Sequence, residues 1–565
     1  MLAELQTAGL LDTLDVELAR ALGRLSGVVC PEVELAIALT SRNVRRGHSC
    51  FPVGTSARDL WPKEAPAPEL PEAEQWKRQI AANPLSNAGP IVLDESGRLY
   101  LRRYWQLEKD IARELASRSA TPATAAEGPP ELESSLRRLF PGREDSLQRR
   151  AALNALRHSV SLLCGGPGTG KTTTVAAIVA LIIERRLHVS KDTPRVLLLA
   201  PTGKSAARLG EAVRKAKGRI DASTVVLGGI PEEATTVHRA LGMRRDGVRF
   251  RRNADLPLEA DVIVLDESSM VDLGLMRQLL DAAPRNATLL IVGDPDQLTS
   301  VEAGSVLRDL VTASNGTWWS DRVTQLSKTY RYDQDQPLGR LVAAIRTGDT
   351  NAVSRLLQQD DADGVHWSSS KGLAAELDRA AVHWSPALST KDPAEHFELR
   401  QRYVMLSPFR RGAIGTERLG AAIADRLRTS EGGESAVTPI IIEENSQELR
   451  VFNGDFAMLV NADSPVAIVQ SEGEGFPEIV EARLPRYSNA FALSVHKAQG
   501  SEFDEVLVVL PEEDAPMLSR ELLYTAVSRA RNRVRLVGPK EVIAAAVSRK
   551  ARRYSGLVDA IADAG

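Results

Sequence analysis

The chain of 565 residues, 43% hydrophobic and 26% charged, is too long for one hydrophobic core and predicts three or four globular domains of about 100 to 200 residues. Its 71 basic and 74 acidic side chains give a net charge of -3, so any nucleic-acid site must be a local basic surface. The three cysteines form no Cys-x-x-Cys pair, which argues against a disulfide framework and a four-cysteine metal site. Residues 1–15 lack a basic signal region, and no apolar run approaches the roughly 18 residues that span a bilayer. We therefore expect a cytoplasmic protein.

Residues 1–118 are predicted to form a mainly helical N-terminal domain. Leu14, Leu18 and Leu22 recur at a spacing that suits one helix face. The stretch ATPATAAEGPP at 120–130 lacks this periodicity and is rich in Ala, Thr and Pro, which is typical of a linker or an exposed loop. We place a linker at residues 119–131.

From residue 132 onward, short apolar runs are each followed by a polar loop and a helical pattern, which predicts an α/β fold with parallel sheets. Residues about 436–488 instead read as short antiparallel strands with an Asn453-Gly454 turn, and predict a small β insert. The apolar runs are SVSLLC (159–164), VLLLA (196–200), VIVLD (262–266), TLLIVGD (288–294), YVML (403–406) and VLVVL (506–510).

The stretch GGPGTGKTTT follows a predicted strand and precedes a predicted helix, which is the context of a phosphate-binding P-loop. Its glycines allow backbone N–H groups to face phosphates, Lys171 can reach the β and γ phosphates, and Thr172 can ligate magnesium. The alternative is a Gly-rich turn without a function. The predicted nucleotide-binding residues here are Gly165, Gly166, Pro167, Gly168, Thr169, Gly170, Lys171, Thr172 and Thr173.

The acidic pair in DESSM follows another apolar strand. Asp266 is predicted to hold Mg²⁺ together with Thr172, and Glu267 to orient the water that attacks the γ-phosphate of the nucleotide. The alternative is a solvated acidic pair at a strand end. These motifs together predict a nucleoside triphosphatase that uses Mg²⁺ and little more, since kinases, GTPases and ring ATPases share them.

Three further polar residues are candidates for sensing the γ-phosphate. Gln297 follows a strand in GDPDQLTSV, where its amide can sense the phosphate, while Arg331 in KTYR and Arg529 in YTAVSRAR can stabilise transition-state charge. A single arginine is usually a surface residue, but two in such motifs favour a catalytic role.

Nine motifs occur in the order of the superfamily 1 helicases and resemble their RecD branch. These are SLQRRA, GGPGTGKTTT, APTGKSAARL, TTVHRAL, DESSMVD, GDPDQLTSV, TYR, SVHKAQGSEFD and YTAVSRAR, within about residues 132–540. The resemblance implies two RecA-like domains, here 132–330 and 331–565, with an SH3-like insert in the second, and 5′ to 3′ movement on single-stranded DNA. It also implies that Gln148 reads the adenine, that Gln297 couples the γ-phosphate to domain closure, and that Arg331 and Arg529 reach across the cleft from the second domain.

Polar side chains after strands in both halves are candidates for contacts to a DNA backbone, without a preference for any base. Phe409 is the best aromatic candidate for stacking on a base. Core packing, helix capping and solvation are the alternatives for these residues. The predicted DNA-binding residues are Thr202, Lys204, Ser205, Thr236, His238, Phe409, Ser494, His496, Lys497 and Ser501.

Residues 242–256, GMRRDGVRFRRNADL, predict a basic β-hairpin around an Asp-Gly turn. One hypothesis is a pin that separates or guides DNA strands, and the alternative is a plain exposed hairpin. Its arginines are Arg244, Arg245, Arg249, Arg251 and Arg252.

The N-terminal segment looks like that of the RecD chain of exodeoxyribonuclease V. The stretches that carry this resemblance are LDVELARALGRL, RRGHSCFPV and GRLYLRRYWQLEKDIA. This resemblance implies a heterotrimer with RecB and RecC chains that repairs broken duplex ends by recombination. No nuclease constellation is evident in the sequence, so any cutting is expected of the complex. The alternatives are a free-standing RecD-like helicase, a stabilising cap in place of a partner-binding domain, or an ATPase subunit that only switches conformation.

Overall fold

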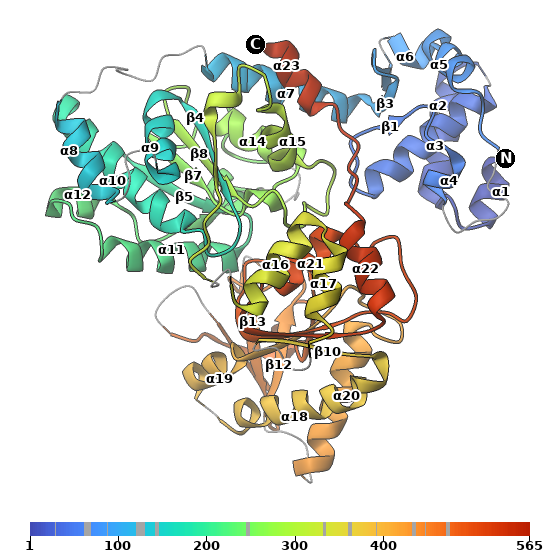
Figure 1. Cartoon of the computed structure of the whole chain (residues 1–565). Helices are drawn as coiled ribbons and strands as arrows, with labels where there is room; N and C mark the ends of the chain where they lie inside the picture. Colours follow the sequence, from blue (N-terminus) through green and yellow to red (C-terminus); the bar gives the residue numbers. More distant parts are fainter. Residues whose placement is uncertain are drawn as a thin grey trace.

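Two sheets of parallel strands form the centres of two lobes, one above the other in Figure 1. The computed structural model describes residues 1–565 except 29, 62–68, 88, 120–129, 142–145, 244–248, 332–334, 360–363, 391, 432–436, 447 and 471–474. Most of the predicted linker, and the tip of the predicted basic hairpin with Arg244 and Arg245, therefore lie outside the described residues.

The first lobe has a six-stranded sheet in the order β6-β5-β7-β8-β4-β9, in which every pairing is parallel. Helices bury both faces of this sheet, as the crossover connections of a parallel sheet require. The strands are β4 (Val160–Gly165), β5 (Val196–Ala200), β6 (Thr235–Thr236), β7 (Val262–Leu265), β8 (Thr288–Gly293) and β9 (Val323–Leu326), and the helices are α8 (Pro130–Leu139), α9 (Leu147–Arg157), α10 (Lys171–Ser190), α11 (Gly203–Lys217), α12 (Thr224–Gly229), α13 (Val237–Leu241), α14 (Leu273–Ala282) and α15 (Val306–Ala313).

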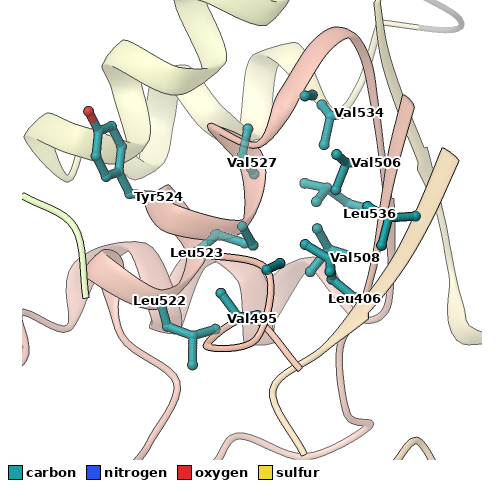
Figure 2. Close-up of a cluster of buried hydrophobic side chains, with 14 of the residues drawn as sticks. Leu406, Val495, Val506, Val508, Leu522, Leu523, Tyr524, Val527, Val534 and Leu536 are labelled. Atoms are coloured by element: carbon teal, nitrogen blue, oxygen red, sulfur yellow. The ribbon is translucent and has the colours of Figure 1, made fainter. Parts of the chain in front are cut away.

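The second lobe has a five-stranded parallel sheet in the order β10-β19-β18-β11-β17. Figure 2 shows part of its core, where aliphatic side chains of helix α21 meet those of the sheet. The strands are β10 (Val365–Ser368), β11 (Tyr403–Ser407), β17 (Ala492–Ser494), β18 (Phe503–Val509) and β19 (Ala530–Val537), and the helices are α16 (Pro337–Thr347), α17 (Thr350–Leu356), α18 (Leu373–Ser389), α19 (Pro393–Arg400), α20 (Thr416–Glu431), α21 (Arg520–Val527) and α22 (Lys540–Ser548).

An antiparallel sheet is inserted into the second lobe, as the sequence predicts. It has five strands in the order β15-β14-β13-β12-β16, and its pairings are all antiparallel. Gly454 of the predicted Asn-Gly turn has a φ of 96°, a left-handed conformation that glycine adopts without strain. The strands are β12 (Val437–Ile442), β13 (Phe456–Val460), β14 (Val466–Val469), β15 (Glu478–Val480) and β16 (Tyr487–Asn489).

The N-terminal part is helical, with a small antiparallel sheet in the order β1-β3-β2 that the sequence did not reveal. The N-terminal part has an apolar core of its own, in which Trp76 is buried. The indole N–H of Trp76 donates to the carbonyl of Glu32. The elements are α1 (Leu2–Thr7), α2 (Thr13–Ser26), α3 (Pro31–Arg45), β1 (Phe51–Pro52), α4 (Ala57–Leu60), α5 (Ala73–Ala82), α6 (Pro84–Asn87), β2 (Ile91–Leu93) and β3 (Arg98–Leu101).

Two helices that the predicted domain bounds assign to other domains pack in the first lobe. Helix α7 (Arg102–Ser119), placed by the sequence in the N-terminal domain, packs on α14 and buries Ile111 and Leu115 in the core of the first lobe. Helix α23 (Leu557–Ala564), placed in the second domain, packs on α7 and α15 in the first lobe. The chain therefore returns from the second lobe to the first before it ends.

Candidate functional site

The P-loop connects β4 to α10 at the carboxyl end of the sheet. Gly168 and Gly170 have φ values of 72° and 80°, so each needs the conformational freedom of glycine to turn the loop. The Lys171 ammonium donates hydrogen bonds to the carbonyl oxygens of Gly165 at 2.6 Å and Gly166 at 3.1 Å. The loop, Lys171 and the start of α10 line one hollow, the arrangement that a phosphate-binding P-loop requires.

The acidic pair lies at the end of β7, a neighbour of β8 in the same sheet. Burial, and then the adjacent charge of Glu267, raise the pKa of Asp266 to about 6. Glu267 has a φ of 50°, an uncommon left-handed conformation for a residue with a side chain, and strain of this kind concentrates at functional sites. Its backbone N–H donates to the Asp266 carboxylate at 2.8 Å, which fixes the orientation of that carboxylate.

One hollow of about 820 Å³, its open mouth included, brings five of the six predicted catalytic residues together, all except Arg529. Thr172 and Asp266 both line it, and their oxygen atoms suit Mg²⁺, which is usually held by one or two protein ligands and by phosphate oxygens. In the described part of the chain no cluster of three or more His, Cys, Asp or Glu side chains forms a protein-only metal site. The lining also includes Lys171, Glu267, Gln297 and Arg331.

A hydrogen-bonded network connects the two lobes beside this hollow. The Tyr524 hydroxyl, from α21 of the second lobe, donates to the Asp294 carboxylate of the first lobe at 3.0 Å. Figure 2 shows this hydroxyl pointing away from the aliphatic cluster that holds its helix. The Gln297 amide donates to the same carboxylate oxygen at 3.1 Å, and burial raises the pKa of Asp294. A predicted γ-phosphate sensor is therefore bonded through one carboxylate to the other lobe.

Arg331 does not lie where the resemblance to the RecD branch implies. It belongs to the segment that leaves the first lobe, which runs along the P-loop: the Tyr330 N–H donates to the Gly168 carbonyl at 2.7 Å. The Arg331 guanidinium is ion-paired with Glu502 of the second lobe and donates to the Ser528 carbonyl at 3.4 Å. It thus reaches toward the second lobe instead of across the cleft from it.

Arg529 is buried inside the second lobe and, with Gln148, is absent from the described lining of the hollow. Its guanidinium donates to the carbonyls of Ser501 at 3.2 Å and of Thr525 at 3.1 Å. In this arrangement Arg529 braces the loop that carries Gly500 and Glu502 to the hollow. Gln148 lies half-buried at the start of α9.

Sequence reasoning missed three residues of the site. Arg208 and Glu502 both line the hollow and are ion-paired with each other, one from each lobe. Arg208 lies one helical turn after Lys204 in APTGKSAAR, and this spacing on α11 could have suggested it. Glu502 and Tyr524 enter the site only through the packing of the lobes, which leaves no local signal.

Two of the predicted phosphate contacts after β5, Lys204 and Ser205, do not present their polar atoms to an open surface. The Lys204 ammonium is buried without a hydrogen bond among the described residues and lies 4.1 Å from the ring centroid of Phe456 in the insert. Burial, and then the charge of Arg400, lower its pKa well below the usual range. Ser205 lines the nucleotide hollow instead, and Thr202 caps α11 by accepting the Ser205 N–H at 3.2 Å.

The other predicted DNA contacts divide into buried and accessible side chains. Ser501 is buried, and Thr236 is buried as the N-cap of α13. Phe409, Ser494 and Lys497 lie partly exposed after β11 and β17, two parallel neighbours whose carboxyl ends meet at one edge. His238 and His496 are partly exposed, and burial lowers the pKa of both side chains.

The base of the predicted basic hairpin is described. Met243 and Phe250 form an isolated antiparallel bridge, and Arg249 and Arg251 are exposed. The Arg252 guanidinium donates to the Pro257 carbonyl at 2.9 Å and so is used within its own loop.

The fold and the site together define a P-loop ATPase of the helicase class. It has two lobes with parallel sheets, a P-loop and an acidic pair in the first lobe, and residues of the second lobe at the same hollow. Three family models match the chain: the N-terminal domain of RecBCD enzyme subunit RecD over residues 7–100, an AAA domain over 148–303 and a UvrD-like helicase C-terminal domain over 489–537. The chain belongs to the RecD family. In the described part of the chain, no helix has the length and apolar character needed to cross a bilayer.

Curated relatives match over most of the chain. RecBCD enzyme subunit RecD of Mycobacterium tuberculosis is 37% identical over 99% of this chain and 96% of its own length. The ATP-dependent RecD2 DNA helicase of Deinococcus radiodurans is 31% identical over 81% of this chain and 58% of its own length. Among solved structures, Bacteroides Pif1 bound to single-stranded DNA is 16% identical, with a TM-score of 0.39 over 71% of this chain and 94% of its own.

Proposed function

We propose that the chain is an ATP-driven DNA helicase that works as the RecD subunit of a RecBCD-type exodeoxyribonuclease V. The observation that carries this proposal is the hollow between the lobes, where Lys171, Glu267 and Gln297 of the first lobe meet Glu502 of the second. A nucleotide bound there contacts both lobes, so its hydrolysis can change how they sit together.

In this mechanism the P-loop N–H groups and Lys171 hold the phosphates of ATP. Thr172 and Asp266 would hold Mg²⁺, which would supply charge neutralisation to the bound phosphates. Glu267 orients the attacking water, Gln297 senses the γ-phosphate, and Arg331 with Arg208 stabilises the developing negative charge. Arg529 acts by positioning the loop of Glu502. Gln148 is proposed to contact the adenine.

Gln297 and Tyr524 share the Asp294 carboxylate, which supports a route from the γ-phosphate to the second lobe. DNA lies along the edge of the second sheet that carries Phe409, Ser494 and Lys497. It is bound with different affinity when the lobes are closed on the nucleotide and when they are open. Movement 5′ to 3′, an SH3-like character of the antiparallel insert and a cytoplasmic location are parts of the same proposal.

The partners proposed are a RecB and a RecC chain, acting together at broken duplex ends in recombinational repair. The match of residues 7–100 to the RecD N-terminal domain supports a subunit in such a complex over a free-standing helicase. Any nuclease activity is assigned to the assembled complex.

The test measures ATP hydrolysis with and without single-stranded DNA, and strand displacement on substrates with a 5′ or a 3′ overhang, with and without the partner chains. We expect DNA to stimulate hydrolysis and Lys171→Ala to abolish it. A rate of ATP hydrolysis that does not change when DNA is added would favour the alternative of an ATPase that only switches conformation. Displacement only from a 3′ overhang would reject the proposed polarity.

A further inference from the structure

A second hollow, of about 420 Å³ with its open mouth included, lies where the insert meets the second lobe. Its polar lining includes Arg410, Thr416, Glu443, Ser494 and Lys497. It lies on the accessible edge after β11 and β17 and is separate from the nucleotide hollow, with which it shares no lining residue.

Glu443, the residue directly after strand β12 of the insert, lines this hollow and is bonded to the cations around it. One carboxylate oxygen, Oε1, accepts from Lys497 Nζ at 2.7 Å and from the Ser488 hydroxyl at 2.9 Å. The other, Oε2, lies 3.1 Å from Arg410 Nη2 and 3.1 Å from Arg486 Nε. The side chain of Glu443 is only 7% exposed, whereas those of its three cationic partners are 28 to 62% exposed.

The cations converge because of the sheet topology. Arg410 follows β11 and Lys497 follows β17, and these parallel strands pair from Met405–Ala492 to Ser407–Ser494. Loops at the carboxyl ends of neighbouring parallel strands meet at one edge, where ligands of such sheets bind. The insert adds Arg486 and supplies the carboxylate, so its position decides whether that carboxylate stays among the cations.

We propose that this hollow is a subsite for one phosphate of the DNA backbone, and that Glu443 is an internal substitute for that phosphate which DNA must displace. The inference rests on the proposed function, since it takes single-stranded DNA as the ligand.

The chemistry of the contacts supports this exchange. A phosphodiester has one negative charge and two non-bridging oxygens, and Glu443 likewise uses both oxygens, each with one or two charged donors. Burial opposes ionisation of Glu443, but hydrogen bonds from Lys497 and Ser488 and the charges of Lys497 and Arg410 lower its pKa to about 2. The carboxylate is thus ionised at any physiological pH and competes for the cations throughout that range.

The matched variants are Glu443→Gln and Glu444→Gln in the full chain. Both remove one negative charge, but Glu444 is exposed and does not line the hollow. Binding of a fluorescein-labelled oligothymidylate is measured by anisotropy across a range of salt concentrations. We expect Glu443→Gln to bind about fivefold or more tightly at low salt, the worth of roughly one ion pair. We also expect its slope of log affinity against log salt to steepen by about 0.7, as one more phosphate contact predicts.

An affinity and slope equal to those of Glu444→Gln would overturn the proposal. Weaker binding by Glu443→Gln would also overturn it, because it would mean that Glu443 positions Lys497 for DNA instead of competing with DNA. Where Glu443→Gln fails to fold, Glu417→Gln replaces it: Glu417 is half-exposed and lies 2.8 Å from Arg410 Nε, so its loss should give a smaller gain of the same sign.

The proposed function has its own readout in the same preparations. If DNA does not stimulate ATP hydrolysis by the unmodified chain, the proposed helicase function is rejected. If the two glutamine variants bind oligothymidylate equally, only the proposal that Glu443 substitutes for a phosphate is rejected. A gain confined to Glu443→Gln supports the subsite even where hydrolysis does not respond to DNA.

Discussion

At the scale of single residues, the site depends on a first-lobe carboxylate that accepts hydrogen bonds from a side chain of each lobe. The Tyr524 hydroxyl and the Gln297 amide share one Asp294 oxygen, and a Cβ added at Gly166 would lie 2.8 Å from that hydroxyl. The closeness of Tyr524 to the P-loop leaves no room for a larger residue at position 166. The P-loop at Gly166 is therefore in close contact with α21 through Tyr524.

Removing the Tyr524 hydroxyl tests this connection. In Tyr524→Phe, the buried Asp294 loses one hydrogen bond, and we expect a loss of about 1 to 3 kcal/mol of unfolding free energy, as for a buried polar group left short of a partner. DNA-stimulated ATP hydrolysis should fall by more than hydrolysis without DNA. The control is Tyr403→Phe: this hydroxyl, also buried in the second lobe, has no hydrogen-bond partner among the described residues, so its removal should cost little. Equal effects of the two variants would contradict the role of Tyr524.

At the scale of secondary-structure elements, the sequence predicted those strands that are continuous apolar runs. The six predicted runs coincide with β4, β5, β7, β8, β11 and β18. Strand β19 was missed because it contains three arginines, Arg531, Arg533 and Arg535. Arg535 is tolerated there because its Nε lies 2.9 Å from a carboxylate oxygen of buried Glu376 on α18. An ion pair between segments so far apart in the chain leaves no local pattern.

The same reasoning explains which site residues were predictable. Lys171, Asp266 and Gln297 follow parallel strands, and the common edge of the sheet brings them together. The buried position of Lys204 and the turn of Arg331 toward Glu502 depend on how the lobes pack, which no spacing within one element encodes.

A buried carboxylate joins three elements at the N-terminal side of the molecule. Glu108 of α7 accepts from the hydroxyls of Ser49 at 2.6 Å and Ser555 at 2.8 Å and from the Gly556 N–H. We expect Glu108→Ala to lower the unfolding free energy by about 2 to 4 kcal/mol, because these buried donors lose their acceptor. Glu108→Gln should cost less, since it keeps an acceptor oxygen. Chemical denaturation measures both, with Glu444→Gln as an exposed control; an unchanged midpoint for Glu108→Ala would contradict the role.

Asp309 of α15 predicts a dependence of stability on pH. Burial raises its pKa to about 7, although a hydrogen bond from Ser305 acts against this shift. In the unfolded chain an aspartate titrates near pH 4, so between about pH 4 and 7 the folded state binds more protons than the unfolded state. Stability from this group is therefore fully present below about pH 4 and is lost as the pH rises to about 7.

The variant Asp309→Asn removes that group, and its stability relative to the original chain should improve as pH rises through this window. Urea denaturation at about pH 5 and about pH 8 measures the difference, on either side of most of the transition. Asp463→Asn, an exposed aspartate in the insert, serves as the control and should give the same difference at both values. A constant difference for Asp309→Asn would show that this carboxyl does not titrate with folding.

At the scale of the whole molecule, the chain passes between the lobes twice on the way to its C-terminus. The first passage runs past Arg331, and the second runs from α22 to α23. Beside the second passage, Tyr554 stacks on His48 of the N-terminal part at 4.7 Å, and Arg553 donates to the Ser300 carbonyl at 3.0 Å. The N-terminal part and the first lobe are thus fastened together, so we expect the second lobe to be the part that moves during a cycle of ATP hydrolysis.

A reversible cross-link between the lobes tests that movement. Ser205 of α11 and Gly500 of the second lobe face each other, and a Cβ built at Gly500 would lie 3.6 Å from that of Ser205, within the range of disulfides. In the double variant Ser205→Cys, Gly500→Cys, we expect oxidation to reduce DNA-stimulated ATP hydrolysis about tenfold or more, because closure and opening must alternate in each turnover. A reductant should restore the rate of the reduced double variant.

The controls for this cross-link are the two single variants under the same oxidant. Gly500 has a φ of 70°, so its cysteine carries a strain of about 1 to 2 kcal/mol, and the single variants correct for it. Equal turnover by the cross-linked and reduced forms would mean that the lobes do not separate at this seam, and the motor would need another moving part.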